Sequence, residues 1–296
     1  MVSQIMAPWT PSFASLMSSQ QATGLPATFS FSNVGADNLP HVRTCVFRGF
    51  LFDDKKTNVL TFTTDRRMMK LKDLEKNSVF EACFYFPSAR KQFRFSGVVR
   101  IITCDHSPEV SFDSASISDG SISSTSPSAA SSESVSSSSG FAEAEIPIVE
   151  LDRDFYADNL KDSGIYNELT YHLVSPTQAK NIESISDFSQ QPPTLAPPTK
   201  AEWQNERLRI WKGLSRTMRG TFRQPTPGSR LTPERQKLID SISRGVDGGS
   251  QEQDNFVVVC MFVNTVDTVD MGVGPGRRVL YKRDRVDHWK EFEVCP

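Results

Sequence analysis

The sequence predicts a mainly β protein with helices, of the α+β class, whose antiparallel strands close into a barrel. Short segments rich in β-branched and aromatic residues alternate with turn-like sequences such as DDKK and PSAR. Six or more such antiparallel strands are expected, and turns separate neighbouring strands within each part of the chain. Closure into a barrel removes the sheet edges that would otherwise pair with other chains, so this architecture is favoured.

The individual elements follow from the same pattern. Strands are expected at residues 41–52, 57–64, 78–86, 91–103, 255–264, 277–283 and 289–294. Helical sequences at residues 201–218 and 233–243 would plug or flank the barrel.

Composition limits the classes of function. The chain has 296 residues, is 38% hydrophobic and carries a formal net charge of -2, which argues against a broad nucleic-acid-binding surface. Any anion site is therefore local. Without a long apolar run we expect no membrane segment, and five widely spaced cysteines without a C-x-x-C pair indicate reduced thiols in a cytoplasmic protein. The four histidines show no ligand spacing, so no metal site is expected.

A serine-dominated tract from Ser107 to Gly140 interrupts the chain. Such a composition buries too little apolar surface to offset its ordering entropy, so we expect a disordered insertion. It fits either a tolerated loop or a tether controlled by phosphorylation. The flanking residues 1–106 and 141–296 are interpreted as two parts of one domain, with a proline-rich connector at residues 186–200.

Residues 59–77, VLTFTTDRRMMKLKDLEKN, pass from a strand into a helix. Met68, Leu71 and Leu74 have helical spacing, and Asp65 is placed as the N-cap. The amino end of a helix presents unpaired N–H groups and favours anions.

Side chains around this helix start add to the anion-binding character. Arg66, Arg67 and Lys70 bring positive charge, and Thr63 and Thr64 bring hydroxyls, which together suit a phosphate monoester. A solvated basic helix face, balanced by the acidic residues that follow, fits the same stretch.

Polar residues also occur within two half-buried strands. Arg43 and Arg48 lie in one apolar run, and Gln92 and Arg94 lie among phenylalanines in another. Each fits an outward-facing side chain. Taken together, an amide and guanidinium groups beside a phosphate site would suit a planar heterocycle with carbonyl and ring-nitrogen edges.

Five segments in order carry a family resemblance: RTCVFRGF, TFTTDRRMMKLKDLEKN, FYFPSARKQFRFSG, WKGLSRTMRGTFRQPTPG and RRVLYKRDRVDHWKEFEVCP. The chain resembles the FMN-binding split β-barrel of the pyridoxamine 5'-phosphate oxidase-like family, in particular its eukaryotic and cyanobacterial subgroup. The resemblance covers most of the chain outside the serine tract. It implies FMN as cofactor and a homodimer with FMN at the subunit interface.

The resemblance also implies a set of cofactor contacts, which are Arg43, Thr44, Val46, Phe47, Arg48, Thr63, Thr64, Arg67, Lys70, Gln92 and Arg278. By this resemblance the first five lie along the flavin, and the two threonines lie near its ring and ribityl chain. Arg67 and Lys70 would bind the phosphate. Gln92 would reach the cofactor from the other subunit.

Two departures from the family pattern bear on function. Met68 stands where the subgroup has a serine, and Gly274 and Gly276 replace the arginine and histidine of the R-x-H motif that grips the substrate in pyridoxamine phosphate oxidases. Arg219 and Arg277 remain candidates for an anionic substrate. No catalytic residue is assigned. The sequence thus predicts an FMN-dependent oxidoreductase for a small amine or alcohol, or a non-catalytic flavin-binding or regulatory protein that has lost this motif.

Overall fold

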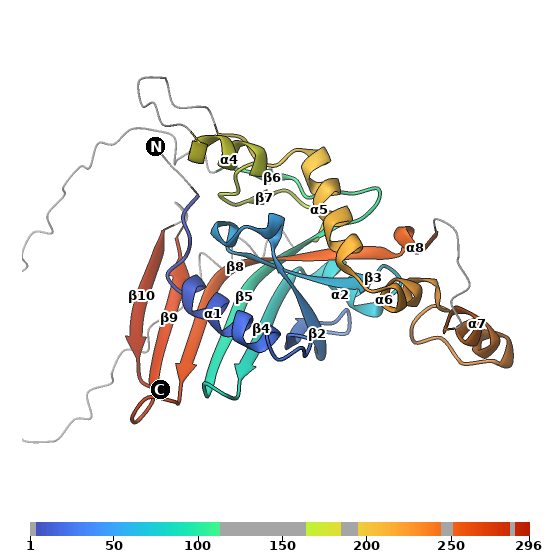
Figure 1. The fold of residues 1–296 in the computed structure, drawn as a ribbon, viewed down its shortest axis with the longest axis horizontal. Helices are drawn as coiled ribbons and strands as arrows, with labels where there is room; N and C mark the ends of the chain where they lie inside the picture. The colour runs from blue at the N-terminus through green and yellow to red at the C-terminus, as the bar shows by residue number, and fades with distance from the viewer. Residues whose placement is uncertain (1–3, 113–163, 185–194, 244–250, 285–287) are drawn as a thin grey trace, which may run out of the picture.

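The computed structural model describes residues 4–112, 164–184, 195–243, 251–284 and 288–296 (Figure 1). Its strands are β1 (Thr28–Val34), β2 (Pro40–Phe50), β3 (Val59–Asp65), β4 (Val79–Phe86), β5 (Lys91–Ile102), β6 (Val110–Ser111), β7 (Leu169–Thr170), β8 (Phe256–Asp270), β9 (Arg277–Arg283) and β10 (Trp289–Val294). Its helices are α1 (Thr10–Gln21), α2 (Met69–Lys76), α4 (Pro176–Ser184), α5 (Lys200–Gly213), α6 (Arg216–Gly220), α7 (Pro233–Ser243) and α8 (Gln251–Asp254), and single 3-10 turns are η1 (Leu51–Asp53), η2 (Lys55–Thr57) and η4 (Thr221–Arg223).

The large sheet is antiparallel and closes on itself, which confirms the predicted barrel. Its strands run in the order β10-β9-β8-β3-β2-β1-β4-β5, and β5 also pairs with β8. Six strands therefore form the closed ring, and β9 and β10 extend from β8 outside it. Strands before and after the serine tract share this ring. The β6–β7 pair forms a separate parallel sheet.

Strict alternation fills the barrel with aromatic rings. Along β4, Phe80, Phe84 and Phe86 point inward and are nearly fully buried, while intervening residues face outward. Phe29 stacks on Phe84 with 4.4 Å between ring centroids. Such side chains bury much apolar area each and dominate the core.

Helix α1, which the sequence analysis did not predict, closes one side of the barrel. Phe13 is fully buried and lies 5.0 Å from the ring centroids of both Phe84 and Phe95. Asn58 fixes the segment before the helix, because its side chain accepts a hydrogen bond from the Ala7 amide at 2.8 Å. The helix therefore supplies part of the core.

Helix α5 covers part of the outer face of the barrel. Trp203 and Trp211 of α5 are buried in a second apolar cluster that includes Val258 and Phe262 of β8. Figure 1 shows α5, α4 and the small β6–β7 sheet on the same side of β8. No helix in the described part of the chain is both long and apolar enough to cross a membrane.

Two local predictions require correction. The helix after β3 begins at Met69 with Met68 as N-cap, so Asp65 does not cap it. Asp65 accepts instead from the backbone and side chain of Arg67. Strand β6 lies within the tract predicted to be disordered, so residues 107–112 have a place in the fold. The rest of that tract, and most of the expected connector, lie outside the described residues.

Candidate functional site

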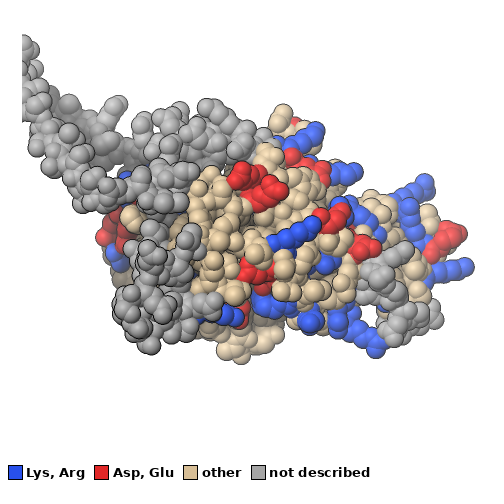
Figure 2. Space-filling view, turned by 90° about the horizontal axis from the view of Figure 1, so that it is seen from above, with Lys and Arg blue, Asp and Glu red and all other residues tan. Residues whose placement is uncertain are grey.

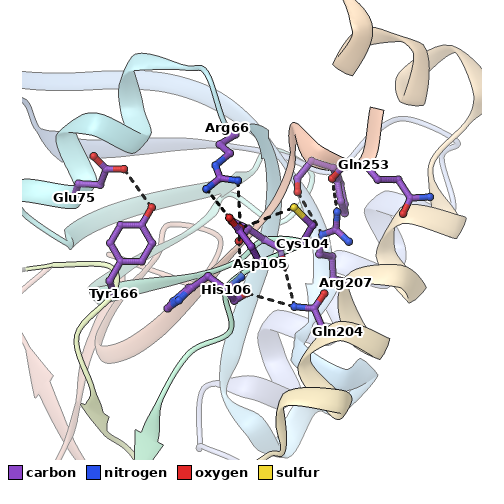
Figure 3. Close-up of polar contacts among 11 residues, drawn as sticks. Arg66, Glu75, Cys104, Asp105, His106, Tyr166, Gln204, Arg207 and Gln253 are labelled. Atoms are coloured by element: carbon purple, nitrogen blue, oxygen red, sulfur yellow. Dashed lines mark hydrogen bonds and ion pairs between the residues drawn. The ribbon is translucent and has the colours of Figure 1, made fainter. Parts of the chain in front are cut away.

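The first of the three cations after β3, Arg66, is paired with a carboxylate. Its two terminal nitrogens contact the carboxylate oxygens of Asp105 at 3.1 and 3.2 Å, and Figure 3 shows the side chain pointing to that residue. The pair is exposed to solvent, and Thr103 also donates to Asp105. These hydrogen bonds, from Thr103 and then from Arg66, hold the pKa of Asp105 at about 2. Arg66 is therefore part of an ion pair at the surface.

The second cation, Arg67, joins distant parts of the chain. Its Nε and Nη2 atoms donate to Asp65 at 2.9 and 2.7 Å, and its terminal nitrogens donate to the carbonyls of Gln224 and Phe222 at 2.9 and 3.3 Å. The hydrogen bond that Arg67 donates to Asp65 is the main reason that the pKa of Arg67 is raised. Most donors of this guanidinium thus have protein partners.

The third cation, Lys70, differs from both. Within the described residues its ammonium has no carboxylate partner, and it lies 5.8 Å from the centre of the Phe62 ring. Burial lowers the pKa of Lys70, and the positive charge of Arg43 lowers it further. A half-buried ammonium without a counter-ion is costly. An anion would remove this cost.

Arg43 lies close to Lys70 and is also without a carboxylate hydrogen bond among the described residues. It donates to the Asn33 side chain and, at 3.1 Å, to the carbonyl of His41. Its guanidinium lies 5.8 Å from the Phe31 ring, whose centroid is 4.9 Å from that of Phe62. Burial lowers the pKa of Arg43. Arg43 and Lys70, hereafter the mouth pair, therefore carry two positive charges over adjacent rings at the end of the barrel.

The barrel is open beside the mouth pair. Strand β2 pairs with β3 only from Phe47 to Phe50, whereas its residues 40–46 pair with β1. Arg48 is the extra residue of a bulge in this short ladder, and its Nε donates to Thr63 Oγ1 at 3.4 Å. Bulges re-aim side chains and end pairing. Burial lowers the pKa of Arg48.

The other predicted contacts near the mouth pair are of two kinds, with side chains either on the outer face of the barrel or buried. Thr44 is exposed and Val46 half-buried on the outer face, whereas the Phe47 side chain is buried in the core. Phe47 could therefore meet a ligand only through its backbone. Thr64 is buried, and its hydroxyl donates to the sulfur of Met68 at 3.3 Å.

Gln92 and Arg278 form a second group on the outer face. Strand register places Gln92 opposite Val269 of β8, which lies opposite Arg278 of β9. Arg278 donates to both carboxylate oxygens of Asp267 at 3.0 and 2.8 Å, and Arg94 pairs with the same carboxylate.

On one chain the two groups are well separated. Thr44 pairs with Ser30, Ser30 with Cys83, and Cys83 with Arg94. These pairs span three strand spacings, or about 14 Å measured around the ring. The mouth pair also lies at the end of the barrel rather than on its outer face. Gln92 and Arg278 therefore do not complete the mouth site of their own chain.

The two candidates for substrate binding stand apart from both groups. Arg277 is exposed and pairs with Glu293 at 3.0 Å. Arg219 of α6 has its guanidinium 6.0 Å from the centre of the Trp211 ring of α5. Neither contacts the mouth pair. Acidic and basic side chains are interspersed on the face seen in Figure 2, in keeping with a local anion site.

Two features of the site were missed. Asp73 is buried, contacts His41 Nδ1 at 3.1 Å and accepts from the Ala36 amide at 3.2 Å, so it fixes the strand ends that hold Arg43. Burial opposes its ionisation, but these hydrogen bonds lower its pKa overall. Separately, a polar cavity of about 460 Å³ is lined by residues 105–110 and α5, and none of the predicted contacts lines it.

Comparisons with known proteins agree with this geometry. Residues 6–103 match the family model of the pyridoxamine 5'-phosphate oxidase FMN-binding domain. An uncharacterized protein of Saccharomyces cerevisiae is 35% identical over the whole of both chains. Pyridoxine/pyridoxamine 5'-phosphate oxidase 2 of Arabidopsis thaliana is 27% identical over 33% of this chain and 48% of its own.

Solved structures show the same fold. A pyridoxamine 5'-phosphate oxidase-related, FMN-binding protein of Nostoc punctiforme superposes with a TM-score of 0.58 at 20% identity, covering 98% of both chains. PhzG of Burkholderia lata gives a TM-score of 0.54 at 12% identity, with 98% of this chain and 93% of that chain covered.

The closed antiparallel barrel with a basic, partly open mouth defines an FMN-binding split barrel. This chain belongs to the pyridoxamine 5'-phosphate oxidase-like family, whose cofactor is FMN. The residues present fit that group, because two half-buried cations without carboxylate partners suit a phosphate ester beside a strand opening.

Proposed function

We propose that this chain forms a homodimer that binds FMN between its subunits and oxidises a small amine or alcohol in the cytoplasm. When bound, FMN supplies two-electron redox chemistry. The single observation that carries the proposal is the mouth pair, Arg43 and Lys70, which places two positive charges at a barrel end with no carboxylate hydrogen-bonded to either among the described residues. A cytoplasmic location is supported by the free cysteines.

The chain's own residues would divide the binding work. Lys70 and Arg43 would hold the phosphate, with the uncapped start of α2 nearby. Arg48 and Thr63 would line the opening of the barrel. Thr64 would contribute less than in relatives with a serine at position 68, because its hydroxyl is directed to the Met68 sulfur.

A second copy of the chain would supply the rest of the site. Gln92 lies on β5, three strands around the ring from the β2 residues of the mouth, and Arg278 lies on β9, outside the ring. A two-fold dimer would bring this outer face against the opening of the partner. Each site would then contain residues from both subunits.

The residues that grip the substrate in the vitamin oxidases are replaced by glycines here. Gly274 and Gly276, at the R-x-H positions, have φ values of +47° and +102°. Residues with a Cβ are strained in this region. This difference supports a substrate other than pyridoxamine phosphate. The same difference favours the second candidate function, a flavin-binding protein without catalysis.

Cofactor binding is tested with FMN and riboflavin, which differ by the phosphate. We expect wild type to prefer FMN, and Lys70→Met to weaken FMN binding by about 10- to 100-fold, the loss expected for a charged hydrogen bond, without changing riboflavin binding. Lys72→Met, on the exposed face of the same helix, is the matched control. Equal affinity of wild type for both ligands would contradict phosphate anchoring.

The shared site is tested by mixing two defective copies. Lys70→Met and Gln92→Leu each remove one side of the site, but a mixed dimer would hold one site with both residues intact. We expect refolded mixtures to regain high-affinity FMN binding that neither variant has alone. No recovery in demonstrated mixed dimers would show that each site belongs to one chain.

Catalysis is tested by anaerobic bleaching of the bound flavin with a panel of amines and alcohols, with and without phosphate. This readout needs no assumption about the electron acceptor. Bleaching by one class supports the oxidoreductase. If FMN binds but no compound bleaches it, the non-catalytic candidate replaces it.

A further inference from the structure

A carboxylate at the centre of the outer-face group has no role in the site described so far. Asp267 lies on β8 between Arg94 of β5 and Arg278 of β9 and accepts hydrogen bonds from both guanidinium groups. Only 13% of its side chain is exposed, against 37% and 35% for the two arginines. The carboxylate is therefore covered while both cations reach the surface.

The register shows why this arrangement holds the arginines in place. Arg94 lies directly opposite Asp267, and Arg278 reaches it diagonally from the neighbouring strand. A bidentate contact fixes the plane of a guanidinium as well as its position. The hydrogen bonds that Arg278 donates to Asp267 raise the pKa of Arg278. Gln92 lies on the same face, one row away.

We propose that Asp267 is a positioning residue that orients Arg94 and Arg278 toward the flavin ring of FMN bound by the partner subunit and sets the charge there. This inference rests on the proposed function. Two arginines and one carboxylate leave one net positive charge in the cluster. The size of this net charge governs how strongly the reduced, anionic flavin is favoured over the oxidised form. Asp267 thereby lowers the reduction potential.

Two substitutions change this charge in opposite directions. Asp267→Asn keeps the shape of the side chain but removes the negative charge, so the flavin potential should rise. Arg94→Gln removes a positive charge, so the potential should fall. We expect about a tenfold change in the ratio of affinities for reduced and oxidised flavin in each case, or about 30 mV for a two-electron couple. Asp267→Asn should also weaken FMN binding several-fold through looser arginines.

Glu293→Gln is the matched control. It breaks another arginine–carboxylate pair, that with Arg277 on β9, which is exposed on both sides. Its potential should equal that of wild type. Potentials are measured by dye-coupled reduction of the FMN-loaded dimer, with FMN affinity measured alongside.

The outcomes separate the inference from the proposed function. Opposite shifts in the two variants, with none in the control, support the role of Asp267. Unchanged potentials in FMN-loaded variants, or shifts of the same sign, overturn it and leave the cofactor site intact. Wild type that binds no FMN overturns the proposed function and this inference together. If Asp267→Asn does not fold, Arg94→Gln still decides by the sign of its shift.

Discussion

Glu202 offers a prediction whose magnitude follows from the structure. Its carboxylate accepts from the hydroxyls of Ser175 and Thr177 at 2.6 and 2.7 Å, and from the amide and hydroxyl of Thr199 at 2.8 and 2.9 Å. Burial would raise its pKa, but these hydrogen bonds outweigh burial and lower the pKa from 4.5 to about 2. Glu202 thereby joins the start of α5 to the segment before α4.

A lowered pKa in the folded state stabilises the protein above the unfolded value and loses this effect as the pH falls. The fall from 4.5 to about 2 corresponds to about 3 kcal/mol at neutral pH, or about 2 kcal/mol after allowance for partial exposure. More than half of this contribution of Glu202 to the free energy of unfolding should be lost by about pH 3. Glu202→Gln should therefore lower the free energy of unfolding by about 2 kcal/mol at neutral pH and much less near pH 3.

The assay is urea unfolding at both pH values, with Glu291→Gln on the exposed face of β10 as control. The control should leave the free energy of unfolding nearly unchanged at either pH. An equal loss of stability for Glu202→Gln at neutral pH and near pH 3 would refute the reasoning, because the carboxylate charge would then contribute nothing.

Three further variants test the barrel and its site. Gly97→Ala should cost at least about 2 kcal/mol in urea unfolding, because its Cβ would lie 2.0 Å from the Phe262 carbonyl oxygen; an unchanged midpoint would contradict the close approach. Gly274→Arg with Gly276→His should destabilise by about 2–4 kcal/mol and give no pyridoxamine phosphate oxidation, since both positions have positive φ; a stable, active variant would refute the altered turn. Met68→Ser should tighten FMN binding about fivefold through one added hydroxyl, measured by fluorescence titration, and weaker binding would contradict a phosphate near Thr64.

The strands of the barrel could be predicted because their alternation is local. Strand β1 was missed although Phe29 and Phe31 alternate with serines, since serine weakens the β signal. Helix α1 was missed as well, yet Trp9, Phe13 and Met17 recur at helical spacing beside a proline in its first turn. Both signals are present in the sequence.

The division of the cations could not be predicted from the sequence. Arg66, Arg67 and Lys70 look equivalent along the chain. They differ because Arg66 meets a carboxylate 39 residues away and Arg67 meets carbonyls 155 and 157 residues away. Such partners are set by the tertiary fold, and no local pattern encodes them. Asp65 was assigned as a helix cap for the same reason, since the side chain of Arg67 competes for it.

The mouth pair and the turn that holds Gly274 and Gly276 differ in how closely they are tied to the closed ring. We therefore expect them to tolerate substitution differently. The mouth pair lies over Phe31 and Phe62, whose strands belong to the closed ring, so altering this region disturbs the core. Gly274 and Gly276 lie in the turn between β8 and β9, and β9 extends outside that ring. Changes in the turn therefore act outside the ring, and their cost comes from the positive φ of the two glycines rather than from the packing of the core. Under the proposed function, this asymmetry predicts that variants of the turn change the choice of substrate more readily than they change FMN binding.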